Sequence, residues 1–187
     1  MALTTPDPQT GLIVFDLQKG IVASPLVHPI GEVVTRARLL ADTFRQRGLP
    51  VVLVNDAGVA PGRGERPRSR EPHPAGWTDL IPELAQQPGD IVVTKRTWGA
   101  FASTNLEDQL KARGVTQVVV VGVATGTGVE ATARQAYEQG FNVTLAIDAM
   151  TDVRPEAHDY SIAKVFPRLG ETGTTQDIVN LLGKRSA

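Results

Sequence analysis

The sequence predicts a single three-layer α/β/α domain around a mainly parallel sheet of roughly six strands, with Rossmann-type topology. Two observations lead to this prediction. Short, continuous apolar runs recur along the chain, which is typical of strands buried on both faces of a parallel sheet. Segments with helical spacing separate these runs, and such alternation favours β–α–β units. The 187 residues are close to the size of one ordinary domain.

The apolar runs give the expected strands in order. The first is GLIVFD at 11–16, and similar runs follow at 50–54, 90–94, 117–121 and 142–147. Each is too short for an ordinary helix, and most are rich in valine and isoleucine, as strands are. No internal repeat and no linker interrupts the series, so the whole of 1–187 is expected to be one domain.

The segments between these runs have helical character. After Pro29, apolar residues repeat at helical spacing until Gly48, which is expected to end the helix. The repeating residues are Val33, Ala37, Leu40 and Phe44. Further helices are expected near 103–113, 127–140 and 155–165, and the tail GETGTTQDIVNLLG is expected to add a short strand and a helix.

Two segments depart from this regular pattern. Residues 1–10 are expected to form a loose N-terminal arm, and residues 55–77 are a long stretch rich in glycine and proline. Loops of that length in compact domains are often lids or binding loops. The alternative is a solvated excursion whose arginines face water, and both interpretations stay open. The arginines are Arg63, Arg66, Arg68 and Arg70.

Composition and charge exclude several classes of function. Hydrophobic residues make up 41% and charged residues 21%, as in soluble globular proteins, and the formal net charge is −1. Such a charge provides no overall positive field for nucleic acid or anionic lipid. No apolar run approaches the roughly 20 residues that span a bilayer. The N-terminus does not resemble a secretory signal. A cytoplasmic protein that acts on a small molecule is therefore expected, without nucleic-acid or membrane partners.

Cysteine is absent, which excludes disulfides, thiolate metal sites and cysteine nucleophiles. The three histidines, His28, His73 and His158, are far apart in the sequence and have no ligand spacing. A histidine metal site or a Ser-His-Asp triad would need scattered single residues. We therefore expect no metal and no cofactor.

A glycine-rich turn, GVATGTGVEAT at 122–132, follows the run VVVV. Ligands of open parallel sheets bind beyond the carboxyl ends of the strands, where this turn is expected to lie. Thr127 and Glu130 fit a capping box for a helix that begins near Gly128. The amide groups and positive dipole end of that helix would favour an anion or a developing oxyanion.

One interpretation of the turn is a nucleotide site. Gly122, Gly126 and Gly128 spell GxxxGxG, and Tyr160 and Lys164 spell YxxxK, as in short-chain dehydrogenases. In those enzymes the glycines follow the first strand, whereas here they follow the fourth. A lone glycine pattern is weak evidence, so an NAD(P)-binding protein is the least favoured interpretation.

Three segments taken together give a more specific resemblance. IVFDLQKG, IVVTKRTWGAF and GVATGTGVEATAR, in this order, resemble the isochorismatase-like hydrolase superfamily, which includes isochorismatases, nicotinamidases and N-carbamoylsarcosine amidases. The resemblance runs from about residue 10 to the end and includes FPRLGET. It implies that Asp16 and Lys95 are catalytic and that Gly128 takes the position of the family's cysteine nucleophile. It also implies a cis Val123–Ala124 peptide and a homo-oligomer.

The glycine at position 128 narrows the chemistry that the resemblance allows. Family amidases attack a carbonyl through the thiolate, and glycine has no side chain to do so. Other members hydrolyse a vinyl ether, which requires a general acid rather than a nucleophile. Asp16 is the candidate acid. Burial would raise its pKa and Lys95 would lower it, and the sequence leaves the winner open.

The remaining candidates form a binding surface. Trp98 and Phe101 are either an apolar wall for a planar ring or core residues. Backbone amides from Thr125 to Gly128 are expected to bind a carboxylate, and one of the loop arginines another. Gln18, Ala124 and Thr127 are further expected binding residues, and Gly128 is expected to leave room for substrate. The rival hypothesis from another class is a binding or scaffold protein that kept the fold without catalysis.

Overall fold

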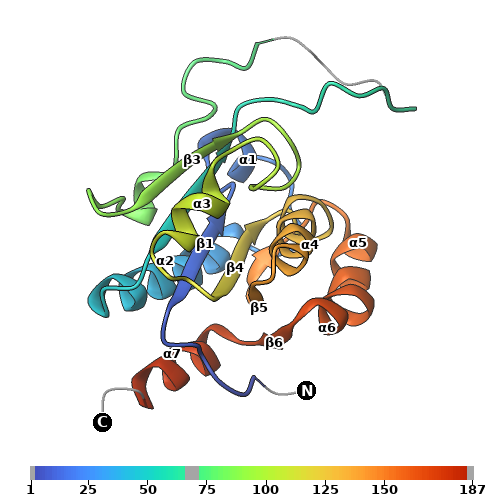
Figure 1. The fold of residues 1–187 in the computed structure, drawn as a ribbon. Coiled ribbons are helices and arrows are strands. Elements are labelled where there is room, and N and C mark those ends of the chain that lie inside the picture. The colour runs from blue at the N-terminus through green and yellow to red at the C-terminus, as the bar shows by residue number, and fades with distance from the viewer. Residues whose placement is uncertain (1–2, 66–71, 185–187) are drawn as a thin grey trace.

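The structure, a computed structural model, describes residues 3–65 and 72–184 (Figure 1). All six strands belong to one parallel sheet with the order β3-β2-β1-β4-β5-β6. The fold class is therefore confirmed, and the sheet is parallel throughout. The strands are β1 (Thr10–Phe15), β2 (Val51–Asp56), β3 (Ile91–Lys95), β4 (Gln117–Val123), β5 (Asn142–Thr151) and β6 (Glu171–Gly173).

Helices follow most of the strands, as the alternation predicted. They are α1 (Lys19–Val22), α2 (Ile30–Gln46), α3 (Leu106–Lys111), α4 (Glu130–Glu138), α5 (Pro155–Tyr160), α6 (Phe166–Leu169) and α7 (Thr175–Gly183). A 3-10 turn, η1 (Pro82–Leu84), precedes β3. Two π-helical turns, η2 (Thr125–Val129) and η3 (Ser161–Val165), lead into α4 and α6. The short elements α1 and η1 were not predicted.

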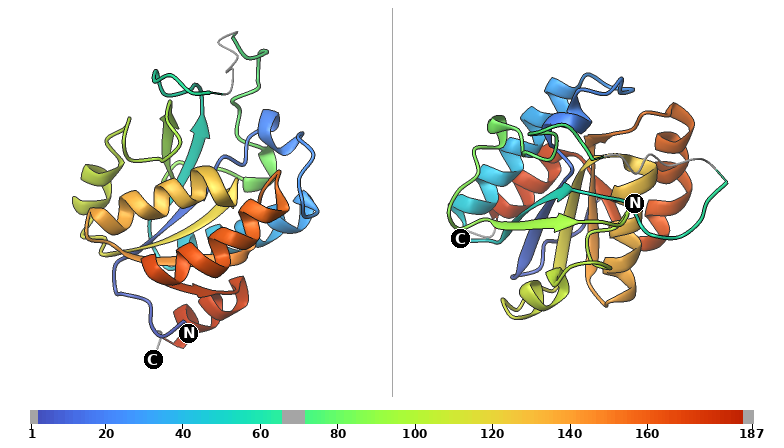
Figure 2. Two further views of the ribbon diagram at one scale, coloured as in Figure 1. Left: turned by 90° about the vertical axis from the view of Figure 1, so that its right-hand side faces the viewer. Right: turned by 90° about the horizontal axis from the view of Figure 1, so that it is seen from above.

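Two apolar layers cover the two faces of the sheet (Figure 2). Leu12 and Val14 of β1 face the layer of α2 and α7, where Phe44 and Leu182 are buried. The other layer contains buried side chains of α3, α4 and α6. Since β1 lies in the middle of the sheet, both of its faces are covered and its six residues are all buried.

A close approach between β1 and β4 requires glycine at position 122. Gly122 has φ of 120°, and a Cβ built there would lie 2.0 Å from the carbonyl oxygen of Phe15. Only glycine fits this conformation and this contact. Because β4 can thus run beside the end of β1, the turn after β4 is brought next to Asp16.

The described part of the N-terminal arm is held against the far end of the sheet. The Thr4 hydroxyl donates to Glu171 over 2.5 Å, and the Asp7 amide donates to the Gln117 side chain over 2.6 Å. The expectation of a loose arm does not describe residues 3–9 of the structure.

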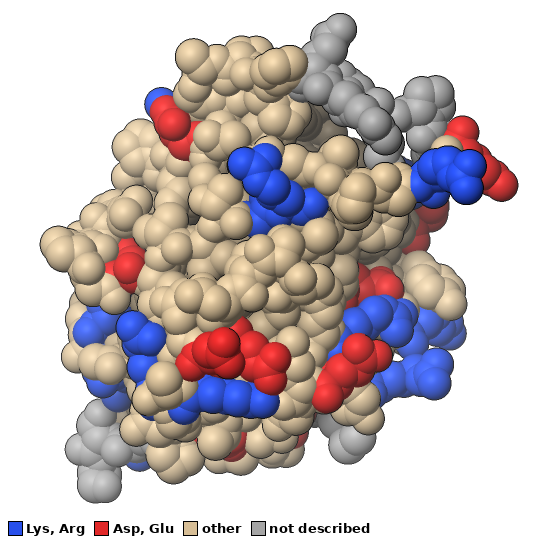
Figure 3. Space-filling model, turned by 45° about the horizontal axis from the view of Figure 1, so that its top comes forward, with Lys and Arg blue, Asp and Glu red and all other residues tan. Residues whose placement is uncertain are grey.

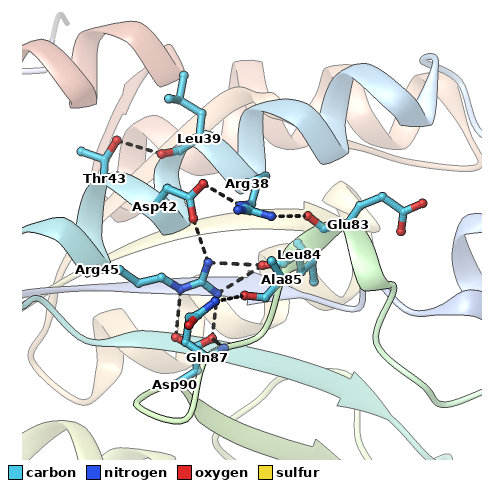
Figure 4. Close-up of polar contacts among 10 residues, drawn as sticks. All are labelled: Arg38, Leu39, Asp42, Thr43, Arg45, Glu83, Leu84, Ala85, Gln87 and Asp90. Atoms are coloured by element: carbon cyan, nitrogen blue, oxygen red, sulfur yellow. Dashed lines mark hydrogen bonds and ion pairs between the residues drawn. The ribbon is translucent and has the colours of Figure 1, made fainter.

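A buried ionic network joins α2 to the segment before β3 (Figure 4). The Arg45 guanidinium lies 2.7 Å from the Asp90 carboxylate, whose side chain is only 2% exposed. The same guanidinium donates to Asp42 and to the carbonyl oxygen of Leu84 in η1. The network fixes the edge strand β3, and therefore Lys95 at its end.

Candidate active site

Three charged side chains meet at the carboxyl ends of the central strands. Asp16 directly follows β1 in a left-handed conformation, with φ of 52°. Its Oδ2 lies 2.9 Å from the Nζ of Lys95, the last residue of β3. The same Nζ lies 3.3 Å from Oδ2 of Asp56, the last residue of β2. The expected catalytic pair, Asp16 and Lys95, is therefore in direct contact.

Asp56 was not predicted as a site residue. The sequence analysis placed it in the long loop, because the apolar run was taken to end at residue 54. In the structure β2 continues to Asp56, whose Cα pairs with that of Lys95 across the sheet. Since neighbouring parallel strands end at the same edge, the acidic residue after VVLVN was the available signal.

The three side chains differ in burial. The side chains of Lys95 and Asp16 are 2% and 6% exposed, whereas that of Asp56 is 25% exposed. Burial raises the pKa of Asp16 to about 7, although the attraction and hydrogen bond of Lys95 oppose this shift. The charge of Asp56 adds to the increase in the pKa. The sequence left open whether burial or Lys95 determines the pKa of Asp16, and in the structure the effect of burial is the larger one.

One carboxyl oxygen of Asp16 has no hydrogen-bond partner. Its Oδ1 is buried and unpaired within the described part of the chain. Buried polar atoms are usually hydrogen-bonded, so each exception needs an explanation. Asp16 is also one of the residues that line a cavity.

Asp16, Lys95 and Asp56 line one cavity of ≈ 270 Å³. Thr127 and Gly128 border it, and the exposed indole of Trp98 lies at its wall. Most of the remaining lining is apolar and consists of Ile21, Leu26, Val123, Ala124 and Val153. Such a cavity has the usual character of a small-molecule site, with apolar walls and a few convergent polar groups. Larger hollows elsewhere contain none of these three charged groups.

Gly128 was expected to leave open room for substrate, but the structure shows no open space beside it. A Cβ built on Gly128 would lie 2.1 Å from Cε1 of Phe15, so the phenyl ring already occupies that volume. Phe15 is fully buried, and the Nζ of Lys95 lies 4.7 Å from the centre of its ring. The ring therefore packs against Gly128 and also contacts the ammonium group.

The turn after β4 differs from the predicted capping box. The structure has no side-chain cap at η2 or α4, and the Glu130 carboxylate instead accepts from Ser161 and pairs with Arg134. A π-helical turn, rather than the regular start of an α-helix, contains Gly128. The cis Val123–Ala124 peptide, implied by the resemblance, is present.

The protein itself uses much of the anion-binding capacity of this turn. The amide of Gly126 donates to the fully buried carboxylate of Asp152 over 2.7 Å. The amides of Thr127 and Val129 both donate to the carbonyl oxygen of Ala124. These three amides are thus committed to protein acceptors. The amides of Gly126 and Thr127, which were expected to bind a substrate carboxylate, therefore already have acceptors within the protein.

Two histidines that are distant in sequence meet behind the turn. His28 and His158 have ring centroids 4.6 Å apart. His158 shares a hydrogen bond of 2.8 Å with Thr125, and burial, followed by the charge of His28, lowers its pKa. Thr125 is therefore a support for the turn rather than part of the cavity wall. Sequence spacing gave no signal for this cluster.

Two other expected binding residues also lie outside the cavity lining. Phe101 is buried in the core, with its ring centroid 5.9 Å from that of Phe141. Gln18 is fully buried, and its side chain bonds only backbone groups. It accepts from the Asp56 amide over 2.6 Å and donates to the carbonyl oxygens of Asp56 and Trp77. Gln18 thus joins the two stems of the long loop.

The long loop is anchored at its second stem by Trp77. A Cβ on Gly20 would lie within 2.1 Å of the indole, so Trp77 packs directly on α1. Arg63 is exposed, whereas Arg66, Arg68 and Arg70 lie outside the described residues. Tyr160, from the dehydrogenase-like pattern, is 64% exposed and does not line the cavity that contains the carboxylates.

Within residues 3–65 and 72–184, no three His, Cys, Asp or Glu side chains form a group that could hold a metal ion. In the same ranges no helix is long and apolar enough to cross a membrane.

The fold and the site define an α/β enzyme with its reaction centre at the carboxyl ends of parallel strands. The Isochorismatase domain model matches residues 10–177, and the chain therefore belongs to the isochorismatase family of hydrolases. It is 38% identical over 178 residues to the isochorismatase-family protein YwoC of Bacillus subtilis, covering 91% of this chain and 93% of YwoC.

Solved structures show the same similarity. An isochorismatase-family protein from Burkholderia thailandensis is 39% identical with a TM-score of 0.91, covering 96% of this chain and 98% of that one. The N-carbamoylsarcosine amidase of Thermoplasma acidophilum is 27% identical with a TM-score of 0.71, covering 89% and 96%. The short-chain-dehydrogenase interpretation finds no support in these matches.

Proposed function

We propose that this hydrolase cleaves a small vinyl ether by acid catalysis, with Asp16 as the general acid and with Gly128 in the place of the family nucleophile. The observation that carries the proposal is the state of Asp16. Its carboxyl is buried, its pKa is raised to about 7, its Oδ1 has no hydrogen-bond partner among the described residues, and the residue lines the cavity together with Lys95 and Trp98. At neutral pH a substantial fraction of Asp16 therefore carries a proton.

A vinyl ether is activated by protonation of its terminal methylene carbon. The ether-bearing carbon then becomes an oxocarbenium ion, which water captures, and the resulting hemiketal breaks into a ketone and an alcohol. This sequence needs a proton donor and a water molecule but no protein nucleophile. The apolar cavity walls support the proposal, since they suit an uncharged ring or chain beside the donor.

Lys95 is a partner of Asp16 in this proposal. Its ammonium contacts both carboxylates and the Phe15 ring, and these contacts hold Oδ2 of Asp16 in place. In this proposal Lys95 holds Oδ2 by its hydrogen bond, and the unpaired Oδ1 carries the proton that is transferred to substrate. After proton transfer, the nearby ammonium stabilises the newly formed carboxylate.

The test uses isochorismate as the vinyl ether and follows the release of pyruvate. The wild type is expected to release pyruvate well above the rate without enzyme. Asp16→Asn keeps the shape but cannot donate the proton, so kcat should fall by roughly 100-fold or more. Equal rates for wild type, Asp16→Asn and buffer would refute the proposal and favour a binding protein.

A further inference from the structure

The cavity contains a second carboxylate, Asp56, which has no role in the protonation step proposed above. Asp56 lines the same cavity as Asp16 and lies on the other side of the Lys95 ammonium. We propose that Asp56 is the general base that activates the attacking water. This inference rests on the proposed function, because it names the partner of Asp16 in that reaction.

The two carboxyl groups have environments suited to opposite roles. Asp16 is nearly buried and keeps one unpaired oxygen, Oδ1. Asp56 is 25% exposed. Its Oδ1 accepts from the Gly58 amide over 3.0 Å, and its Oδ2 forms an ion pair with Lys95 over 3.3 Å. Both oxygens thus face donor groups, the arrangement that a proton acceptor requires. Pairs of carboxyls in unlike environments commonly divide the acid and base roles in this way.

The backbone holds Asp56 firmly at this position. Its amide and carbonyl groups both bond the side chain of the buried Gln18, over 2.6 and 3.0 Å. Its pairing with Lys95 in the sheet fixes it from the opposite side. The greater exposure of its carboxylate allows water to reach it from the cavity mouth.

The two carboxyl groups share one ammonium group. Both Oδ2 atoms lie within 3.3 Å of the Lys95 Nζ, and both residues line the same cavity, where a water molecule would have to reach Asp56. Glycosidases that invert configuration also divide the acid and base roles between two carboxyl groups around an oxocarbenium-like centre, with a wider separation of roughly 6.5–9.5 Å. The arrangement here has the same logic.

The steps balance and restore both groups. The Asp16 proton bonds to the methylene carbon through the electrons of the double bond, which leaves an oxocarbenium ion. The water oxygen bonds to that carbon while its proton passes to Asp56. In the hemiketal the hydroxyl proton returns to Asp16, the bond between carbon and ether oxygen breaks, and Asp56 protonates the departing oxygen. The products are a ketone and an alcohol.

The test compares Asp56→Ala with Asp56→Asn on isochorismate, with and without added formate. Both variants should lose roughly 100-fold or more in kcat/KM. Formate should restore at least roughly a tenth of the lost activity to Asp56→Ala, where the space is vacant, and none to Asp56→Asn, whose amide fills it. A fall in rate with rising pH should persist in Asp56→Ala but move to lower pH, because the charge of Asp56 no longer raises the pKa of Asp16.

Each outcome has a distinct meaning. If the wild type is active and Asp56→Ala retains wild-type kcat/KM, Asp56 is not the base and only this inference fails. If Asp56→Ala is impaired, folded by circular dichroism and not rescued by formate, Asp56 only positions Lys95 and the inference also fails. A wild type that releases no pyruvate overturns the proposed function and this inference together.

Discussion

At the level of single residues, the proposed catalysis depends on the proton held by Asp16. Desolvation by the surrounding core raises its pKa more than the neighbouring ammonium lowers it. The same core includes Phe15, whose ring fills the volume beside Gly128 and contacts Lys95. The ring of Phe15 thus fills the space that a side chain at position 128 would need, and it also packs against the ammonium group of Lys95.

The pH dependence of activity follows from the pKa of Asp16. The active form carries the proton, so kcat for vinyl ether hydrolysis should fall as pH rises through about 7. A profile of pyruvate release between pH 5 and 9 measures this. A rate that increases steadily from pH 6 to 9 would show that ionised Asp16 is the active form.

Substitution at position 128 should be destabilising unless Phe15 is also changed. Gly128→Cys forces the new Cβ against the phenyl ring, and overpacking of this kind costs about 1–3 kcal/mol. Combining it with Phe15→Val should cost less than the sum of the two single changes, by about 1 kcal/mol or more. Urea unfolding of the four proteins measures the coupling.

The matched control is Gly31→Cys, since no atom lies within 4 Å of a Cβ at that position. It should change stability by less than about 0.5 kcal/mol. If Gly128→Cys is as mild as Gly31→Cys, the contact between Phe15 and Gly128 is not tight. The double variant is also the proper protein for an amidase assay, because it makes space for the restored thiol.

At the scale of elements, the sequence predicted strands well and turns poorly. Strands β1, β2, β4 and β5 are largely buried on both faces, and the edge strand β3 on one, so their positions are encoded locally as short apolar runs. The turn after β4 depends on Asp152, which binds the Gly126 amide from the end of β5. A pattern within residues 122–132 cannot contain that information, and the predicted capping box was therefore wrong.

In the candidate site, too, locally encoded residues were predicted and residues that depend on distant partners were not. Asp16 and Lys95 were predicted because the resemblance marks them at strand ends. Asp56 was missed because the strand boundary was set two residues early, a common error of local patterns. The roles of Gln18 and Thr125 depend on partners more than 30 residues away in sequence, Asp56 and His158.

The ionic network of α2 and β3 gives a prediction at this scale. Arg45→Ala would leave the buried Asp90 carboxylate without its cation, and removal of one partner of such a pair costs about 3–5 kcal/mol. Arg38→Ala removes a more exposed pair with Asp42 and should cost less than about 1 kcal/mol. Similar losses on thermal unfolding would contradict the central role of Arg45.

At the scale of the whole molecule, positive and negative side chains are interspersed on the face shown in Figure 3, especially along its lower part. The formal net charge of −1 agrees with this mixture. No large field therefore dominates stability, and individual buried groups should determine how stability varies with pH.

Asp16 should make the protein less stable as pH rises from about 4 to about 7. The folded-state pKa is raised, so the unfolded chain releases this proton first, and the contribution of Asp16 is complete only below its ordinary pKa. The unfolding free energy of the wild type, measured relative to that of Asp16→Asn, should therefore fall as pH rises through this window. Urea unfolding at pH 5, 6, 7 and 8 measures it.

Asp177→Asn provides a control, because the pKa of Asp177 is shifted in the opposite direction to that of Asp16. Hydrogen bonds from Thr174 lower the pKa of Asp177, so both the folded and unfolded forms are ionised above pH 5. The difference between wild type and this variant should be constant from pH 5 to 8. A shift in both variants alike would assign the effect to some other group.

The most direct test of the central claim is a carbon-13 NMR titration of the Asp16 carboxyl, assigned by comparing labelled wild type with Asp16→Asn. We predict a titration midpoint near pH 7, from burial of the carboxyl beside Lys95. A midpoint below pH 5 would mean that Asp16 is fully ionised at neutral pH, and the proposed acid catalysis would be contradicted.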